Sequence, residues 1–297
     1  MIPVRQTKLI VNTKHIEHNI KQIQDFVGKE VTVMPVIKSS GYGTGIDTRT
    51  DIFTKLNIKI LCVAVVDEGI ALRERGYDGE ILILNQPLEE EITTALQYDL
   101  ILSVCISDFI LSLNKLAKQK KQMAKIHLEI NTGMNRTGIN PKDIYNYINL
   151  IKELDYIELD GIYSHLSSSD TNVNYTKEQI RIFDNIANIV KKEFNLKYIH
   201  ICNTGGILNF KEAHYNSVRP GISIYGHFPN DNLKNKINLI PATILKTKIS
   251  YIHEVIVGDA ISYNRSFIAK KNMKIATLPI RICRWSSKEL SRSSSYK

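Results

Sequence analysis

Short apolar runs alternate with amphipathic stretches through the first 226 residues of the chain. The runs are too short for buried helices and are rich in β-branched residues, so they predict strands buried inside a sheet. The stretches between them, such as residues 67–77 and 177–194, carry apolar residues at helical spacing with charges between, which is typical of crossover helices. The predicted strands are residues 31–37, 61–66, 80–85, 100–105, 125–131, 159–165, 197–203 and 218–226.

Eight strand and helix units in about two hundred residues favour an α/β fold, a (β/α)8 barrel of the TIM type, whose chemistry lies at the carboxyl ends of its strands. A doubly wound sheet is the alternative. From about residue 240 the pattern changes to period-two alternation, which predicts antiparallel strands of a second, all-β domain. We therefore expect the barrel to occupy residues 1–235 and an incomplete β-domain to occupy residues 236–280.

Composition and cysteine use add limits to this picture. A chain of 297 residues that is 43% hydrophobic can bury a large core. No run approaches membrane-spanning length and the N-terminus lacks a secretory pattern, so we expect a cytoplasmic protein with no membrane partner. The four cysteines are scattered without metal-type pairs, so we expect neither a disulfide framework nor a metal site, and we interpret Cys62, Cys105 and Cys202 as small core residues.

The formal net charge of +9 raises the question of a nucleic-acid partner. Residues 281–297 carry a net charge of +4, which leaves +5 on the rest of the chain. Those remaining charges are dispersed, as on an ordinary solvated surface, so we expect no nucleic-acid partner.

Lys38 closes the first predicted strand and leads into a glycine-rich turn at residues 41–45. An ammonium at the end of a buried strand is costly to desolvate, which favours the free amine that attacks a carbonyl. The glycines let the backbone approach a ligand closely, and Tyr42 can offer a hydroxyl. A surface lysine beside an ordinary glycine turn is the structural alternative, and the glycine spacing is not that of the dinucleotide fingerprint.

Further polar residues follow later predicted strands. Arg136 lies in a polar turn after residues 125–131, although a surface arginine in a loop would look the same. His165 ends the sixth strand, where a lone histidine is usually a satisfied core residue. Residues 200–208 form a strand, a polar turn and two glycines that open a helix, a geometry that presents backbone N–H groups to a phosphate.

Five segments resemble motifs of the alanine racemase family in the family's order and spacing. They are KSSGYG at residues 38–43, TGMNRTG at 132–138, GIYSH at 161–165, NTGG at 203–206 and RPGISIYG at 219–226. The resemblance covers residues 1–280. It implies a homodimeric isomerase that uses pyridoxal 5'-phosphate to interconvert L-alanine and D-alanine for peptidoglycan synthesis. A racemase of broader range, for example one acting on serine, remains open.

The resemblance also implies roles for individual residues. Lys38 would form the Schiff base with the cofactor, and Arg136 would contact the cofactor's phenolic oxygen and the substrate carboxylate. His165 would pack beside the pyridine ring and hydrogen-bond Arg219, which would face the pyridine nitrogen. The remaining cofactor-binding residues would be Tyr42, Asn203, Thr204, Gly221 and Ile222, of which Thr204 and the amides of Gly221 and Ile222 would hold the phosphate.

Glu129 and Arg219 add detail to the chemistry that the resemblance implies. Relatives often carry a lysine where this chain has Glu129, and in some of them that lysine is carbamylated and faces the arginine with a negative charge, so we expect Glu129 to support Arg136 directly. A guanidinium cannot readily give up a proton, so Arg219 would leave the pyridine nitrogen unprotonated. A ring in that state is a weaker electron sink, which favours α-proton exchange over decarboxylation or transamination.

The resemblance stops at residue 280, where relatives continue into Gly-Tyr-Ala-Asp-Gly and this chain reads RICRW. Read one nucleotide later, allowed codons for residues 281–285 encode Gly-Tyr-Ala-Asp-Gly, and the single Trp codon forces the last glycine. Our hypothesis is a one-nucleotide insertion after the codon for Ile280, which the DNA sequence tests directly. The serine-rich, basic residues 281–297 are expected to be disordered. Loss of the family's second proton-transfer tyrosine predicts a weakly active or inactive chain with a compromised dimer, or a catalytically dead cofactor-binding barrel.

Overall fold

The computed structural model describes residues 7–280, which divide into two compact units. One unit is Asn12–Ala242, and the other joins the residues before Asn12 to those from Thr243 onward. The expected boundary at residue 235 lies a few residues before this division. The N-terminal segment was also expected in the barrel, but it belongs with the second unit, because strand β1 (Lys8–Val11) pairs with strand β10 (Thr243–Lys246).

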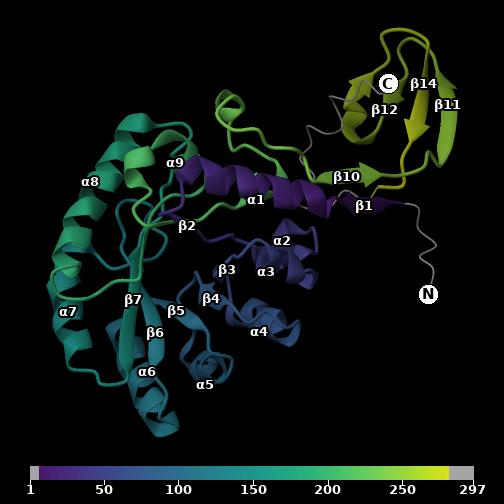
Figure 1. The fold of residues 1–297 in the computed structure, drawn as a ribbon. Helices are drawn as coiled ribbons and strands as arrows, with labels where there is room; N and C mark the ends of the chain where they lie inside the picture. The colour runs from purple at the N-terminus through teal and green to yellow at the C-terminus, as the bar shows by residue number, and fades with distance from the viewer. Residues whose placement is uncertain (1–6, 281–297) are drawn as a thin grey trace. The chain divides into compact units, whose positions relative to one another are not determined.

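The parallel strands of the larger unit form a ring, of which Figure 1 labels β2 to β7, and each of the eight predicted strands has at least a short counterpart in it. Six of them form one continuous sheet in the order β3 to β8, and β2 pairs with β9. Hydrogen bonds close the ring on both sides of that pair, from the Ile37 N–H to the Cys62 carbonyl and from the Arg219 N–H to the Cys202 carbonyl, each 2.9 Å. The strands are β2 (Thr32–Val33), β3 (Ile60–Val63), β4 (Glu80–Ile83), β5 (Ile101–Val104), β6 (Ala124–Glu129), β7 (Ile157–Tyr163), β8 (Tyr198–His200) and β9 (Ser217–Val218).

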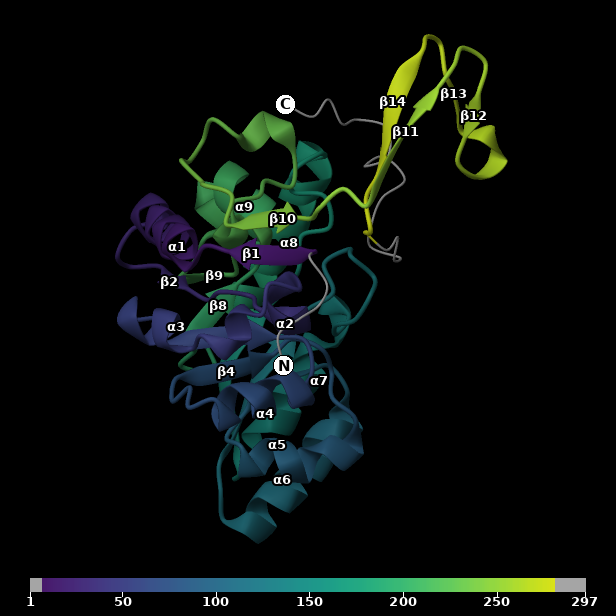
Figure 2. The same cartoon turned by 90° about the vertical axis from the view of Figure 1, so that its right-hand side faces the viewer.

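Helices connect successive strands on the outside of the ring, and Figure 2 shows the same arrangement from the side. Their inward faces are apolar: α8 buries Ile180, Phe183 and Val190 along one stripe. Asn172 caps that helix by accepting a hydrogen bond from the Tyr175 N–H at 3.0 Å. The helices are α1 (Thr13–Val27), α2 (Lys38–Tyr42), α3 (Asp51–Lys55), α4 (Val66–Glu74), α5 (Ile92–Gln97), α6 (Ser107–Lys120), α7 (Ile144–Lys152), α8 (Val173–Val190) and α9 (Thr204–Asn209).

The α/β barrel followed by β-strands confirms the predicted fold class, with local differences at its first and last strands. The run at residues 218–226 was predicted as one strand, but only Ser217–Val218 forms a ladder, and Ile222–Tyr225 is a 3-10 helix. The run at residues 31–37 was predicted as one strand, but only Thr32–Val33 forms a ladder. Pro35 lacks an N–H group, so the run continues as single contacts, among them a bridge between Val36 and Cys62. The run is nevertheless buried from Val33 to Ile37, and it therefore still leads Lys38 out of the core.

The smaller unit consists of two-stranded antiparallel pairs, as the period-two pattern predicts. Besides β1 with β10, the pairs are β11 (Tyr251–Val255) with β14 (Met273–Thr277), and β12 (Ala260–Ile261) with β13 (Phe267–Ile268). Residues 281–297, for which disorder was expected, lie outside the described residues, as does Cys283.

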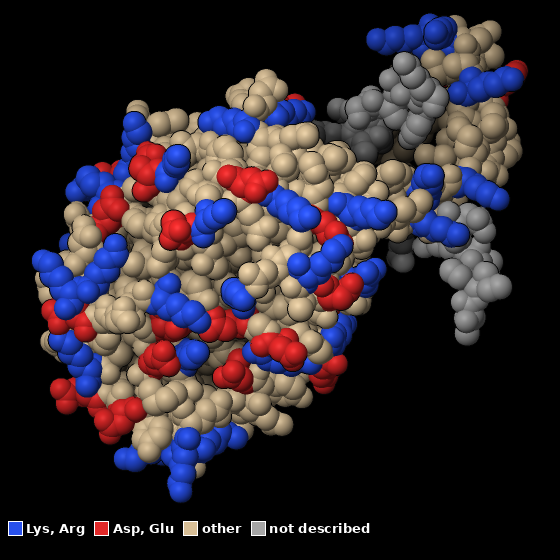
Figure 3. Space-filling view, in the orientation of Figure 1, with Lys and Arg blue, Asp and Glu red and all other residues tan. Residues whose placement is uncertain are grey.

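Between residues 7 and 280 no helix is both long enough and apolar enough to cross a membrane. Within the same range no group of three metal-ligating side chains comes together, and Cys62, Cys105 and Cys202 are free thiols. On the face shown in Figure 3, the blue basic and red acidic side chains of the larger unit are interspersed.

Candidate active site at the carboxyl ends of the barrel strands

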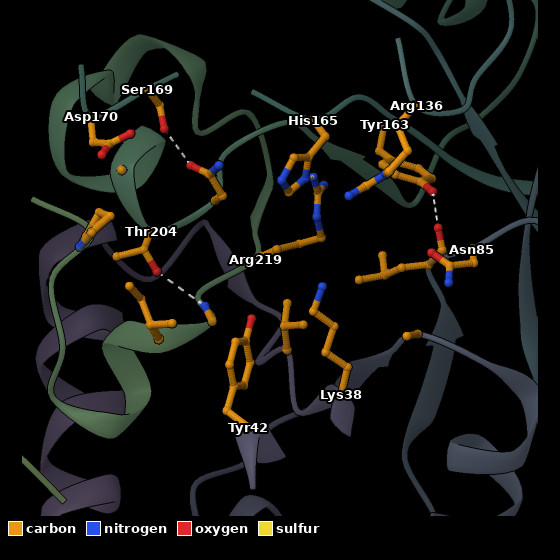
Figure 4. A pocket seen from close by; sticks show the side chains of 18 residues that line it. Lys38, Tyr42, Asn85, Arg136, Tyr163, His165, Ser169, Asp170, Thr204 and Arg219 are labelled. Carbon is orange, nitrogen blue, oxygen red and sulfur yellow. Dashed lines mark hydrogen bonds between the residues drawn. The ribbon is translucent and has the colours of Figure 1, made fainter. Parts of the chain in front are cut away.

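A cavity of about 220 Å³ lies where the polar residues leave the barrel strands. Figure 4 shows that Lys38 and Tyr42 enter it from one side and that Arg136 and His165 approach from the opposite side. The predicted site residues that line the cavity are Lys38, Tyr42, Arg136, His165, Asn203, Thr204, Arg219, Gly221 and Ile222. Glu129 does not line it, so the structure brings together all of the predicted cofactor and substrate residues but not the predicted supporting residue.

Lys38 is part-buried and is followed by an unusual left-handed turn. Ser39, Ser40, Gly41 and Tyr42 all have φ between 52° and 62°, a conformation that costs about 1 to 2 kcal/mol per non-glycine residue. Gly41 is required for a second reason, since a Cβ there would lie 2.3 Å from the Ile46 side chain. Strain of this kind persists only where surrounding contacts hold it in place, and it is concentrated at functional sites.

Two carboxylates hold the turn after Lys38. Glu68 accepts hydrogen bonds from the Ser39 N–H at 2.5 Å and from the Ala64 N–H, just after β3, at 2.7 Å. Asp47 accepts a hydrogen bond from the Ser40 hydroxyl at 2.7 Å. The lysine is therefore tied to the neighbouring strand through a carboxylate that the sequence did not single out.

Arg219 is almost fully buried beneath the cavity, with 2% of its surface exposed. Its Nη2 donates to the Ser164 carbonyl at 2.7 Å and lies 3.4 Å from His165 Nδ1, while its Nη1 contacts His200 Nδ1. The guanidinium also lies over the Tyr163 ring, 5.0 Å from its centroid. Burial lowers the pKa of Arg219, but a guanidinium remains cationic because its ordinary pKa lies far above neutrality.

His165 carries no charge in this setting. Burial, followed by the positive charges of Arg219, Arg136 and Lys38, lowers the pKa of His165 to about 3. Gln179 holds the backbone of residues 165–167 in place: its side chain donates to the His165 carbonyl at 3.1 Å and accepts from the Ser167 N–H at 3.0 Å. A neutral imidazole whose Nδ1 faces Arg219 can accept a hydrogen bond but is a weak base.

Arg136 lies on a short loop at the cavity mouth, and its side chain is exposed. Asn131 organises this loop by accepting from the N–H groups of Gly133 and Asn135 at 3.0 and 3.1 Å. The loop closes at a bridge between Ile130 and Ile139, which leaves Arg136 at the mouth.

The structure does not show the expected pairing of Glu129 with Arg136, since the ion pairs among residues 7–280 do not include it. Glu129 is the last residue of β6, and its carboxylate is buried, whereas the loop carries Arg136 out to the exposed mouth. Sequence spacing alone could not show that separation.

Thr204, Gly221 and Asn203 form the opposite end of the cavity. Asn203 caps α9 by accepting from the Gly206 N–H at 3.0 Å and also receives the Ser169 hydroxyl at 2.7 Å. The Thr204 hydroxyl lies 3.3 Å from the Gly221 N–H and 3.0 Å from the Ser223 hydroxyl. A Cβ on Gly221 would lie 2.6 Å from the Tyr42 hydroxyl, so the backbone reaches the cavity wall only because this residue is glycine.

Several lining residues were not predicted. Asn85, which follows β4, and Ser169, Asp170 and Pro229, which lie on loops, also line the cavity. Asn85 could have been found, because it is the polar residue that closes the predicted strand 80–85. The loop residues carry no such signal, since polar side chains and proline are common in every loop.

Comparison with known proteins agrees with these observations. The sequence model described as alanine racemase, N-terminal domain, matches residues 11–229. Alanine racemase 2 of Caldanaerobacter subterraneus is 36% identical over 280 residues, which cover 93% of this chain and 72% of that protein. The alanine racemase of Treponema denticola is 35% identical, with 93% and 74% covered.

A solved structure gives the same result in three dimensions. The alanine racemase of Clostridium difficile superposes with a TM-score of 0.85 at 29% identity, covering 94% of this chain and 74% of that chain. Its similarity extends over both the barrel strands and the later β-strands, given that coverage. Taken with the family match over most of the sequence, it follows that this chain belongs to the alanine racemase family of isomerases.

Proposed function

We propose that this chain binds pyridoxal 5'-phosphate in the barrel cavity and takes part in the interconversion of L-alanine and D-alanine. The proposal rests on one observation: five segments that are far apart in sequence bring their polar residues to a single cavity. These residues are Lys38, Arg136, His165, Thr204 and Arg219. A cytoplasmic homodimer that supplies D-alanine for peptidoglycan belongs to the same proposal.

The residues present fit this cofactor. At one end, Thr204 and the glycine backbone at Gly205 and Gly221 can surround a phosphate, and a Cβ on Gly205 would lie 2.5 Å from the Ser169 hydroxyl. Arg219 supplies a buried cation beneath the middle of the cavity, and Lys38 supplies an amine at its side. This donor set suits an anionic phosphate and an aldehyde, and we assign Tyr42, Asn203 and Ile222 to the wall around them.

The cofactor, when bound, supplies an electron-withdrawing ring that makes the α-proton of an amino acid acidic. Lys38 holds and moves that proton at its Nζ. Arg219 would offer the bound ring only N–H donors, which would keep an additional proton away from the ring nitrogen. Arg136, exposed at the mouth, binds the substrate carboxylate with its planar guanidinium.

Racemisation needs proton-transfer groups on both faces of the reacting carbon. Of the residues that line the cavity, His165 is too weak a base, because its pKa is about 3. Tyr42 does not suit that role either, since burial raises the pKa of its phenol above the ordinary value and its hydroxyl approaches the glycine at 221. In the family the second group is a tyrosine of the partner subunit, and this sequence does not carry it after residue 280. We therefore infer that the chain exchanges the α-proton through Lys38 but racemises alanine weakly or not at all.

The first test is cofactor binding. Adding pyridoxal phosphate to the full chain should produce the absorbance that the cofactor gains when a lysine amine binds it, and Lys38→Ala should abolish it. Lys115→Ala, on the exposed face of α6, is the matched control and should retain the absorbance. Equal absorbance in the Lys38→Ala variant would refute the proposal.

The second test separates proton exchange from racemisation. Loaded protein in D2O should exchange the α-proton of L-alanine in a Lys38-dependent manner, and D-alanine is measured in the same samples. L-serine as a parallel substrate tests the broader-range alternative. Cofactor binding without any exchange would instead support the catalytically dead barrel.

A further inference from the structure

Beneath the cavity, a chain of buried polar side chains runs from Arg219 into the interior of the barrel. Its members are Arg219, His200, His127 and Asp160, which are between 0% and 3% exposed. They come from three neighbouring barrel strands and the segment after a fourth: His127 from β6, Asp160 from β7, His200 from β8 and Arg219 from after β9. None but Arg219 lines the cavity.

The donors and acceptors in this chain can be assigned from chemistry. A guanidinium has only N–H groups to offer, so His200 Nδ1, which contacts Arg219 Nη1, must present its lone pair. His200 is then neutral, with its proton on Nε2. That nitrogen lies 2.9 Å from His127 Nδ1, which must in turn be an acceptor.

The same reasoning reaches a carboxylate. With Nδ1 of His127 accepting, its proton lies on Nε2, which is 3.5 Å from Asp160 Oδ2. At this separation the two atoms approach each other without forming a hydrogen bond, and both are buried with no hydrogen-bond partner among residues 7–280, which leaves each available to the other. The direction of donation is therefore fixed from Arg219 to His200, to His127, and finally to Asp160.

Two features of the backbone accommodate this arrangement. The pairing of β6 with β7 slips between Ile126 and His127, which leaves Asp160 as the extra residue of a β-bulge. A bulge redirects a side chain that regular alternation would place elsewhere. Next to it, a Cβ on Gly161 would lie 2.8 Å from the Cε1 and Nε2 atoms of His127, so only glycine leaves room for that ring.

We propose that Asp160, His127 and His200 are positioning residues that form a directed polar relay, which holds the Arg219 guanidinium in a fixed orientation beneath the cavity. The relay places two neutral imidazoles between a cation and an anion, and each link polarises the next. Reversal of any one link would set two N–H groups against each other in a dry interior. That Arg219 faces pyridoxal phosphate rests on the proposed function, whereas the existence of the relay does not.

The relay can be tested in the unloaded full chain by NMR of 15N-labelled histidine. Long-range proton–nitrogen correlation should show His127 and His200 as neutral rings protonated at Nε2, with signals assigned through His127→Gln and His200→Gln. A proton on Nδ1 of either ring, or a doubly protonated ring, would overturn the proposal. His214, which contacts the Ile207 carbonyl through Nε2 at 2.8 Å, is an internal reference outside the relay.

A second measurement concerns Arg219 itself. Asp160→Asn keeps an oxygen acceptor but removes the charge, so the guanidinium protons of Arg219 should exchange with solvent roughly threefold to tenfold faster. The matched control is Glu178→Gln, which removes an exposed carboxylate of α8 that pairs with Arg181 at 2.6 Å and lies outside the relay. Equal exchange in both variants would show that Asp160 is merely structural and would overturn the proposal.

These outcomes separate the two proposals. Nε2 protonation of both rings in a chain that takes up no pyridoxal phosphate would leave the relay intact and refute the proposed function. Cofactor uptake through Lys38 in a chain whose His127 and His200 rings are protonated at Nδ1 would support the proposed function and refute the relay.

Discussion

The two units of the chain use strands in different ways. In the barrel, parallel strands are buried on both faces, and their carboxyl ends deliver the polar residues of the cavity. In the smaller unit the strands pair through their backbones, but of its described residues only Val255 and Ala269 are buried. Leu245, Tyr251 and Ile252 are each more than half exposed. Strand pairing by itself therefore does not create a core, and the site belongs to the unit whose strands have one.

The largest expected effect comes from truncating the same residue type in a strand of each unit. Leu82 is fully buried in β4, within a cluster that includes Met34 and Ile60. Leu82→Ala should lower the free energy of unfolding of the barrel by about 2 to 5 kcal/mol, because it removes buried methyl groups and leaves a cavity. Urea denaturation measures the change.

The matched substitution is Leu245→Ala in β10, where the side chain is 57% exposed. It should change the free energy of unfolding by no more than about 0.5 kcal/mol. Comparable losses for both variants would show that the smaller unit has a core of its own, and the contrast between the units would fail.

The sequence predicted the barrel and its cavity well, because the hydrophobic pattern and the direction of the strands determine both. The barrel strands follow from runs of buried residues, and the cavity residues lie near their carboxyl ends because parallel strands end at one edge of the sheet. The run at residues 218–226 is the exception, since it leaves the sheet after Val218 and becomes a 3-10 helix at Ile222–Tyr225. The pairing of β1 with β10 was missed, since a short strand carries no sign of a partner more than two hundred residues away. The relay was missed for a similar reason: a β-bulge at Asp160 directs it, and bulges leave no pattern in a single sequence.

A smaller effect should arise at the turn that holds Lys38. Glu68→Gln removes the charge that receives the Ser39 and Ala64 N–H groups, so the strained turn should loosen. We expect pyridoxal phosphate to bind roughly tenfold more weakly, which corresponds to the loss of one charged hydrogen bond worth about 1.5 kcal/mol. Titration of the cofactor absorbance measures this.

Asp67→Asn provides the control, because Asp67 is exposed in the same first turn of α4. It should leave cofactor affinity unchanged. If the two variants bind the cofactor equally well, Glu68 does not support the lysine.

Acid should destabilise the barrel through a histidine whose pKa is lowered in the folded state. Burial and neighbouring cations lower the pKa of His165 to about 3, below the ordinary value near 6.5. Between these values the unfolded state binds a proton that the folded state does not, so stability decreases as pH falls, by up to about 1.4 kcal/mol per pH unit for one group. His165→Gln should reduce this slope in urea unfolding between pH 7 and pH 5. His253→Gln, in the smaller unit, should leave the slope unchanged. Identical slopes in the parent chain and both variants would show that His165 does not contribute to the loss of stability in acid.

The smallest effect concerns Glu129, whose carboxylate the sequence placed opposite Arg136. Its Oε2 is buried without a hydrogen-bond partner among the described residues. A charged group with one buried oxygen left without a partner is unfavourable, whereas the amide of a glutamine has almost the same shape and no charge to desolvate. Glu129→Gln should therefore leave the free energy of unfolding unchanged or raise it by about 1 kcal/mol, and it should not alter the binding of a substrate carboxylate at Arg136. Calorimetric unfolding of the unloaded chain, together with alanine binding to the loaded one, provides both measurements. A loss of stability accompanied by weaker alanine binding would show instead that Glu129 and Arg136 do act as a pair.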